Sequence, residues 1–193
     1  MNQIQKTILE NPKRKDSFWK CFLFFRAIKN GNLKKIESLL NQGFDPNANR
    51  YQGLSSVSLG VKYGNLQTVQ ILLNFGADPN SVDETTGMTP LIHSILEEGL
   101  TEILLLLIHR GVDLNQKDGI GMSPLHHCVN EGKLEPFRIL LENGANPNIQ
   151  DRDGVTCMNL AKSSHGMFEF AELLFKHGAD PTIKDKHGKI YLM

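Results

Sequence analysis

Apolar residues recur along this chain in short clusters that end at regularly placed glycines, and the polar segments between them carry a second glycine series. The glycines that close an apolar cluster are Gly43, Gly76, Gly111, Gly144 and Gly178. Those of the polar segments are Gly53, Gly87, Gly121, Gly154 and Gly188, which lie 34, 34, 33 and 34 residues apart. A period of this size predicts stacked supersecondary units rather than one closed core, because each unit buries its apolar face only against its neighbours.

The unit is clearest over residues 121–148, where the pattern predicts a short helix, a tight turn and a second helix. Pro124 suits the first helical position, since its missing N–H would have no acceptor within the helix, and Ser123 before it can cap the helix. We expect Gly132 to reverse the chain and Gly144 to end the second helix. Apolar residues three and four apart on that helix predict one buried face.

A turn rich in proline, aspartate and asparagine follows most of the second helices. The four turns of this kind are Asp45-Pro-Asn47, Asp78-Pro-Asn80, Asn146-Pro-Asn148 and Asp180-Pro-Thr182. Aspartate and asparagine fold back on their own backbone and proline fixes a backbone angle, so the chemistry of these residues predicts turns. Each turn leads into a polar tip that ends at a glycine of the second series. The tips predict hairpin-like fingers between the helix pairs.

These motifs resemble the ankyrin repeat, whose period is about 33 residues. The resemblance is carried by Met88-Thr-Pro-Leu91, Met122-Ser-Pro-Leu-His126, Gly76-Ala-Asp-Pro-Asn80 and Gly178-Ala-Asp-Pro-Thr182. It covers about residues 19–188. It implies an all-α ankyrin-repeat solenoid of helix-turn-helix units, whose inner helices and β-hairpin-like fingers form a concave face.

The resemblance divides the chain into three parts. We expect a basic N-terminal segment or cap at residues 1–18, an ankyrin repeat domain at 19–187, and the start of a truncated sixth repeat at 188–193. The five expected repeats are 19–52, 53–86, 87–120, 121–153 and 154–187. The final segment is a frayed cap, a naturally shortened repeat or the point at which a longer protein is cut, and the sequence leaves these alternatives open.

Two kinds of departure from the family pattern are visible. The repeats that start at Gly53 and Gly154 have Ser55-Ser-Val-Ser58 and Thr156-Cys-Met-Asn159 in place of the Thr-Pro-Leu-His signature. The other departure is one extra residue before Gly99, another before Gly166 and a third in the finger of residues 81–86. We expect the first two to lengthen a first helix or the turn after it.

The N-terminal part is basic, although the whole chain is neutral. Lys and Arg together number 21, as do Asp and Glu, but residues 1–35 hold nine basic residues against two acidic ones. Such a run is a solvated face or, alternatively, a patch that contacts nucleic acid or another anionic surface. The first helix is expected to start at Asp16 or Ser17. Trp19 and Phe24 fall outside its apolar stripe, and we interpret them as a hydrophobic cap or as a docking patch.

Cysteine usage and the length of the apolar clusters bear on the compartment. Cys21, Cys128 and Cys157 are odd in number and share no ligand-like spacing, which fits a reducing compartment. The N-terminus lacks the apolar core of a secretory signal, and the apolar clusters are far shorter than the roughly 18 residues that span a membrane. We therefore expect a cytoplasmic or nuclear protein that has no membrane partner.

The chain shows no constellation typical of catalysis, metal binding or cofactor binding. His126, His127 and Cys128 are consecutive, and consecutive helical side chains point about 100° apart, so they do not converge on one ion or one substrate. The resemblance implies instead that His126 makes a structural hydrogen bond between repeats. Phosphate-binding loops, dinucleotide fingerprints, nucleophile elbows and zinc-protease motifs are missing from the sequence. We expect no enzyme, cofactor, metal or small-molecule substrate.

The resemblance implies that the residue after each finger glycine faces the concave side. These residues are all apolar: Leu54, Met88, Met122 and Val155. We expect the partner-binding face to include four more residues: Tyr51, Tyr63, Ile120 and Arg152. A mixed-charge rim would come from Arg50, Lys62, Asp83, Glu84, Glu97, Glu98, Lys117 and Asp118, together with that arginine. The alternative for each apolar side chain is packing against the neighbouring finger.

A modification is implied by the resemblance alone. Asn80, Asn115 and Asn148 each follow a leucine eight positions earlier, like ankyrin asparagines that a cytosolic dioxygenase hydroxylates in animals. A plain role as turn residues is the interpretation that we favour.

Taken together, the sequence predicts a scaffold or adaptor, a protein–protein interaction module that binds a protein partner on its concave face and performs no catalysis. One alternative is the targeting or substrate-recognition fragment of a larger enzyme or of a ubiquitin-ligase adaptor. The other is contact with an anionic surface or nucleic acid through the basic N-terminal segment, although neutral overall charge gives no reason to expect nucleic acid as the main partner.

Overall fold

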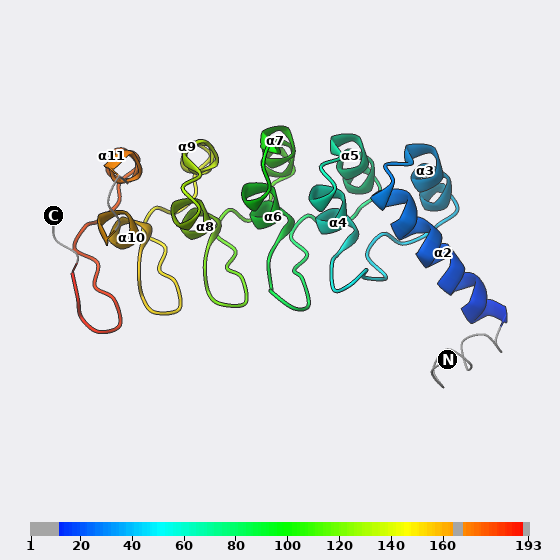
Figure 1. The fold of residues 1–193 in the computed structure, drawn as a ribbon, viewed down its shortest axis with the longest axis horizontal. Helices are drawn as coiled ribbons and strands as arrows, with labels where there is room; N and C mark the ends of the chain where they lie inside the picture. The colour runs from blue at the N-terminus through cyan, green and yellow to red at the C-terminus, as the bar shows by residue number, and fades with distance from the viewer. Residues whose placement is uncertain (1–11, 164–167, 191–193) are drawn as a thin grey trace. The chain divides into compact units, whose positions relative to one another are not determined.

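The computed structural model describes residues 12–163 and 168–190, and these residues form ten α-helices and no strand. Successive helices are paired, and loops project from the pairs as fingers (Figure 1). The helices are α2 (Pro12–Lys29), α3 (Leu33–Asn41), α4 (Ser56–Lys62), α5 (Leu66–Asn74), α6 (Pro90–Leu96), α7 (Thr101–His109), α8 (Pro124–Asn130), α9 (Leu134–Glu142), α10 (Cys157–Ser163) and α11 (Phe168–Lys176). The chain divides into an N-terminal unit, residues 1–78, and a C-terminal unit, residues 79–193.

The long helix α2 opens the N-terminal unit and contacts both α3 and α4. Phe24 is completely buried, with its ring centroid 4.5 Å from that of Phe44. An exposed docking patch at Phe24 is therefore wrong, because α2 packs against two helices, whereas Trp19 is 47% exposed. The expected helix start at Asp16 or Ser17 is also wrong: α2 begins at Pro12, since proline suits the first helical position. The helix crosses the predicted boundary between residues 18 and 19.

In the C-terminal unit, α6, α8 and α10 line up as inner helices, and α7, α9 and α11 lie on the side away from the fingers (Figure 1). Thr89 and Ser123 cap α6 and α8, and a proline follows each cap, as predicted. Helices α6 and α8 have the same length, seven residues, so the extra residue before Gly99 lies in the turn and not in the helix. The extra residue before Gly166 falls outside the described residues.

Aspartate organises three of the four fingers in the C-terminal unit. In the finger of α8, Asp118 Oδ1 accepts hydrogen bonds from the backbone N–H groups of Ile120 and Met122, at 3.0 and 2.8 Å. Asp151 and Asp185 repeat this arrangement with the residues two and four positions further on. Because one carboxylate oxygen holds both N–H groups, each finger keeps its turn without the ladder of a true β-hairpin. The described residues contain only isolated β-bridges.

Neighbouring fingers approach each other so closely that side chains would not fit between them. Gly119 donates its backbone N–H to the Thr86 carbonyl at 2.9 Å. A Cβ atom added to Gly87 would lie 2.5 Å from the backbone nitrogen of Gly119, well inside van der Waals contact. The finger glycines therefore do more than permit a positive φ, which is +68° at Gly87.

Asparagine side chains join the turn after one second helix to the turn after the next. Asn80 Oδ1 accepts the backbone N–H of Asp113, and Asn115 Oδ1 accepts that of Asn146, at 2.9 and 2.8 Å. Asn148 bonds twice to the following turn, accepting from Asp180 N–H at 2.7 Å and donating to the Gly178 carbonyl at 3.1 Å. Within the N-terminal unit, Asn47 makes the same pair of bonds to Asp78 and Gly76. These amides satisfy backbone N–H and C=O groups in the turn that follows the next second helix.

Candidate functional site

The residues predicted to form the binding face occupy the inner-helix and finger side of each unit. In the C-terminal unit, Met88, Met122 and Val155 stand at the same position of three successive repeats, and all three are half-buried. Ile120, at a finger tip, is 61% exposed, the highest value among the apolar residues predicted for this face. Arg152 is exposed and donates to the carbonyl of Gly119. Packing within the fold thus buries these side chains only in part.

The predicted residues of the N-terminal unit differ in exposure. Tyr51 is half-buried, with its ring 5.8 Å from that of Phe25, and its backbone forms an isolated β-bridge with the half-buried Leu54. Tyr63 is 41% exposed, and the Lys29 ammonium lies 5.8 Å from its ring centroid. A cation at this distance is attracted by the aromatic face.

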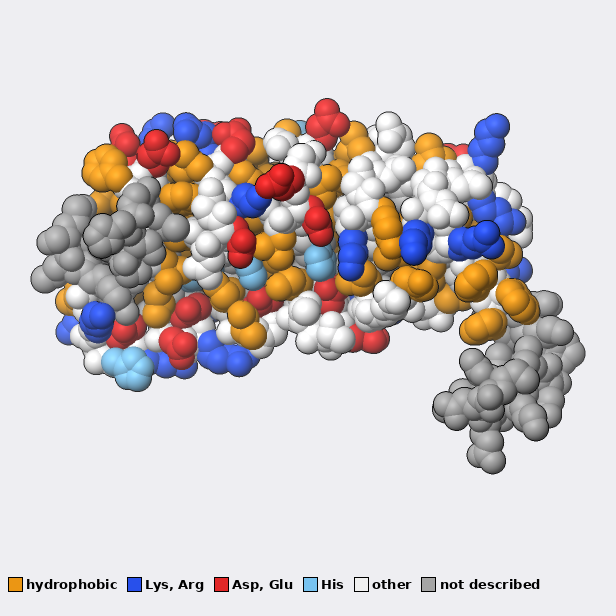
Figure 2. Space-filling model, viewed as in Figure 1, with side chains coloured by type: hydrophobic (Ala, Val, Ile, Leu, Met, Phe, Trp, Pro, Cys, Tyr) orange, Lys and Arg blue, Asp and Glu red, His pale blue; other side chains and the backbone are white. Residues whose placement is uncertain are grey.

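Two histidine–aspartate pairs tie inner helices to fingers in the C-terminal unit. His93 Nε2 lies 2.6 Å from Asp83 Oδ2, and His127 Nε2 lies 2.9 Å from Asp118 Oδ2. Both carboxylates are buried, at 4% and 8% exposure. Their expected place on a charged rim is therefore wrong, because each side chain turns inward to the imidazole of its own repeat. Figure 2 shows histidine side chains with acidic ones beside them near the middle of this face.

The sequence analysis missed both pairs, although a signal was present. Each histidine stands directly after the position of the signature histidine, and each aspartate stands at the start of the finger before it. The coincidence in successive repeats would have indicated a contact. Glu97, Glu98 and Lys117, which are also expected on the rim, are exposed.

The aspartate of the lengthened finger is less well satisfied than its counterpart. Asp83 Oδ2 accepts from Thr86 Oγ1 at 3.1 Å as well as from His93, but its buried Oδ1 has no hydrogen-bond partner among the described residues. The extra residue in this finger moves the backbone N–H groups away, so Met88 N–H bonds to the Thr86 hydroxyl instead. Leaving a buried carboxylate oxygen unpaired reduces the net stabilisation from that side chain.

His126 makes the inter-repeat contact that the resemblance implied. Its Nδ1 lies 2.7 Å from Ser123 Oγ, and its Nε2 lies 3.0 Å from the Val155 carbonyl, which belongs to the next finger. Burial lowers the pKa of this imidazole below its ordinary value, against a smaller opposing effect of the carbonyl. The ring is a structural link, and its burial favours the neutral form.

We expect this link to make stability depend on pH. The unfolded chain protonates His126 near pH 6.5, before the folded protein does, so the contribution is complete above that pH and is lost as pH falls toward the lowered folded pKa. Urea unfolding is measured at about pH 7.5 and at about pH 5.5, on either side of the ordinary pKa of histidine. Between these two pH values, the free energy of unfolding should fall more for the wild type than for His126→Gln. Equal losses in both proteins would contradict the assignment, since the other histidines are common to both.

A shallow groove of about 310 Å³ follows the turn after α6, where the extra residue lies. Glu97 and Glu98 line it together with Lys133, whose Nζ is 3.5 Å from Glu98 Oε1. The glutamate of this pair is 91% exposed, so the ion pair contributes little to stability and remains available to a partner. The groove thus lies between the turn after α6 and the first residues of α7 and α9.

Neither metal ligation nor thiol chemistry finds support among the described residues. They contain no group of three His, Cys, Asp or Glu side chains placed to hold a metal ion. Cys128 and Cys157 are completely buried, and burial raises the pKa of both thiols. Of the helices in the described ranges, none has the length and apolar content that crossing a membrane requires.

Paired helices, finger loops and turn-to-turn asparagine bonds define a protein built from stacked helical repeats. The chain belongs to the ankyrin repeat family, since the family model described as "Ankyrin repeats (3 copies)" matches residues 24–118 and 102–185. The predicted fold class, all-α ankyrin repeats, is thereby confirmed. Ankyrin repeats are protein-interaction modules.

Similar proteins come from plants and animals. The chain is 39% identical over 71 residues, 37% of its length, to the ADP-ribosylation factor GTPase-activating protein AGD4 of Arabidopsis thaliana. It is 31% identical over 128 residues, 66% of its length, to the B-cell lymphoma 3 protein homolog of Mus musculus. It is 39% identical over 70 residues, 36% of its length, to protein phosphatase 1 regulatory subunit 12A of the same species. The matches span 9%, 28% and 7% of these relatives.

Proposed function

We propose that the chain is a scaffold or adaptor that binds a protein partner through the side formed by its inner helices and fingers, and that it performs no catalysis. The observation that carries the proposal is the exposure of Ile120 at the tip of a finger whose turn is fixed by the buried Asp118. An apolar side chain on a fixed loop loses little conformational entropy when it is covered by a partner. The half-buried Met88 and Met122 offer adaptable apolar contacts beside it.

The charge of the C-terminal unit's face would then select the partner. Exposed Glu97 and Glu98 line the groove after α6, and Lys117 and Arg152 are exposed on fingers. Rim charges act mainly on the rate of association and on the choice of partner. Tyr51, Leu54 and Tyr63 extend the proposal to the N-terminal unit.

The proposal predicts that apolar truncation weakens binding without unfolding the protein. A partner is first identified by chemical cross-linking in cell extract and mass spectrometry, and is then purified. We expect the triple variant Met88→Ala, Ile120→Ala, Met122→Ala to raise the Kd for this partner by about tenfold or more, because a few apolar residues carry most of an interface's free energy. Isothermal titration calorimetry measures the Kd, and urea unfolding checks the fold.

The matched control replaces exposed apolar residues on the outer helices. Leu105 of α7 is 39% exposed and Phe175 of α11 is 41% exposed. The variant Leu105→Ala, Phe175→Ala should bind as the wild type does. Unchanged affinity in the triple variant, or an equal loss in the control, would count against the proposed face.

A second function has some support from the comparisons. Relatives named as a GTPase-activating protein and as a phosphatase regulatory subunit share these repeats over 9% and 7% of their lengths. In this interpretation the module is the targeting or substrate-recognition part of an enzyme. Sequencing the native transcript for an adjoining catalytic domain tests it. Hydroxylation of Asn80, Asn115 and Asn148 remains a prediction beside their turn-to-turn hydrogen bonds.

A further inference from the structure

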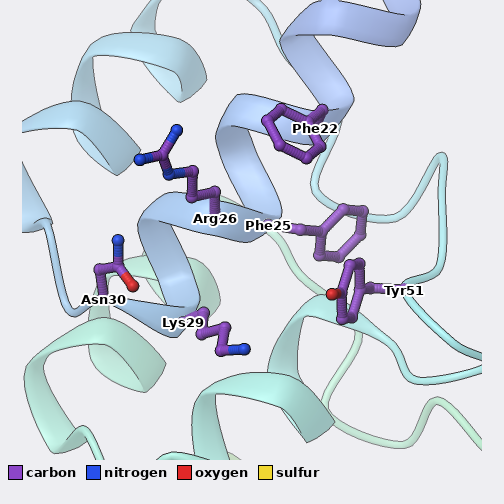
Figure 3. Close-up of a pocket in the computed structure, with 6 residues that line it drawn as sticks. All are labelled: Phe22, Phe25, Arg26, Lys29, Asn30 and Tyr51. Carbon is purple, nitrogen blue, oxygen red and sulfur yellow. The ribbon is translucent and has the colours of Figure 1, made fainter.

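A pocket of about 350 Å³ lies between α2 and the finger that contains Tyr51, in the N-terminal unit. The residues that line it are Phe22, Phe25, Arg26, Lys29, Asn30 and Tyr51 (Figure 3). Of these six residues, Tyr51 alone is among those predicted for partner binding. The first helix of the pocket is rich in aromatic and basic residues.

The two cations of the pocket have no acidic partner among the residues that the structure describes. Arg26 and Lys29 are exposed, stand one helical turn apart on α2 and both line the pocket, with their charged ends pointing in different directions (Figure 3). Among the residues that the structure describes, neither lies within 4.0 Å of a carboxylate oxygen, whereas Lys133 in the C-terminal unit does. The lining contains no acidic residue. The pocket is therefore electrostatically complementary to an anion.

The remaining walls are aromatic and polar. Phe22 is 45% exposed, while Phe25 is buried and holds Tyr51 by ring contact, so one wall is available and the other is fixed. Asn30 is exposed and its side-chain amide offers one acceptor and two donors. Figure 2 shows hydrophobic and basic side chains gathered together over the N-terminal helices.

We propose that this pocket binds an acidic segment of a partner protein, in which an apolar side chain is flanked by aspartate or glutamate. The apolar side chain would pack against Phe22 and Tyr51, and the carboxylates would pair with Arg26 and Lys29. Asn30 would bond a backbone amide of the segment. The inference rests on the proposed interaction function and adds the chemistry of one partner site.

A protein segment fits this pocket better than a nucleic acid does. Sequence-tolerant binding of single strands uses a basic groove that follows the phosphate backbone, with several aromatic platforms in succession. Here two cations lie on one turn of one helix, and Phe22 is the only lining phenylalanine that is exposed. The amide of Asn30 can bond a peptide backbone or a nucleic-acid base. The small number of cations and the short length of the pocket therefore decide in favour of a protein segment.

The test selects peptides from a random library displayed on phage against the full chain, and measures their binding through the intrinsic fluorescence of Trp19. This is the single tryptophan of the protein, and its ring lies 5.9 Å from that of Phe22. We expect the selected tryptophan-free peptides to be enriched in Asp and Glu next to an apolar residue. For the variant Arg26→Ser, Lys29→Ser, their Kd should rise by about tenfold or more, and salt should weaken binding to the wild type.

The matched control is Arg138→Ser, Lys176→Ser, which removes one arginine and one lysine from exposed positions of the outer helices α9 and α11. It should change the Kd by less than about threefold, since neither residue lines the pocket and the charge of an exposed side chain is screened by salt. Selected peptides without acidic bias, no selected peptide at all, or equal losses in both variants would overturn the proposal. A labelled single-stranded DNA that loses binding in the pocket variant, while no acidic peptide does, would also overturn it, in favour of nucleic acid.

Failure of this proposal can be told apart from failure of the proposed function. Peptides or partners that bind the pocket variant normally but are lost with Met88→Ala, Ile120→Ala, Met122→Ala would leave the interaction function intact and remove only the pocket. Sedimentation of the wild type and of the pocket variant measures whether either protein self-associates. Self-association that only the wild type shows would mean that a second copy of the chain occupies the pocket.

Discussion

Replacing Gly87 by alanine is expected to destabilise the C-terminal unit by about 3 kcal/mol or more. The new Cβ would meet the backbone nitrogen of Gly119 at 2.5 Å and its Cα at 2.9 Å. Backbone atoms of a neighbouring finger cannot move aside as the end of a flexible side chain can. The N–H of Gly119 also bonds to the Thr86 carbonyl, so relieving the clash breaks an inter-repeat hydrogen bond.

Gly111→Ala is the matched control for this effect. Gly111 has a φ of +74°, close to the +68° of Gly87, but nothing lies within 4 Å of an added Cβ. Its substitution should cost only the strain of a left-handed backbone, about 1 kcal/mol. Urea unfolding followed by circular dichroism gives both values. If the two variants lose the same stability, the close approach of the fingers has no energetic weight.

Asp118→Ala is expected to have the second large effect, a loss of about 3 kcal/mol. The substitution removes three hydrogen bonds at a buried site, from the backbone N–H groups of Ile120 and Met122 and from the ring of His127. Each of these donors would be left without its partner, and an unsatisfied buried donor costs more than the net value of the bond. Heat or urea denaturation provides the measurement.

The equivalent aspartate of the preceding finger provides an internal comparison. Asp83→Ala removes the bonds to His93 and Thr86 but also removes a buried oxygen that has no partner among the described residues. Asp83→Ala should lower the free energy of unfolding by about 1–2 kcal/mol, which is less than the effect of Asp118→Ala. Asp113→Ala, at an exposed turn, should be smaller still. The reverse order for the two buried positions would show that the backbone bonds within the finger carry little of the stability.

The repeat architecture could be predicted because it is encoded locally. Glycine spacing, the cap and proline at Ser123 and Pro124, and the apolar spacing within helices each act over a few residues, and the structure has a helix where they predict one. The inter-repeat bond of His126 followed from the family resemblance. These features repeat with the period, so each repeat supports the interpretation of the next.

Contacts that join a finger to a helix could not be predicted in the same way. Asp83 and Asp118 look like rim residues by composition, since aspartate in a polar loop is usually solvated, and the only sequence signal for their contacts with His93 and His127 is the recurrence of each pair in successive repeats. The burial of Phe24 depends likewise on α2 meeting two helices at once. The pocket beside Phe22 combines α2 with a finger whose place no local pattern specifies.

The asparagine bonds between turns have a consequence for how such a chain can change in length. The side-chain oxygens of Asn80, Asn115 and Asn148 each accept a hydrogen bond from the following turn. In each case the donor is the backbone N–H at the same position of that turn. Donor and acceptor thus recur at matching places in successive repeats, up to the last turn, which has Thr182 in place of the asparagine. If one whole repeat were duplicated, its turn would have the matching donor and acceptor for both neighbouring turns. Lengthening the chain by a complete period therefore preserves the asparagine hydrogen bonds between turns, whereas inserting part of a period would break one of them.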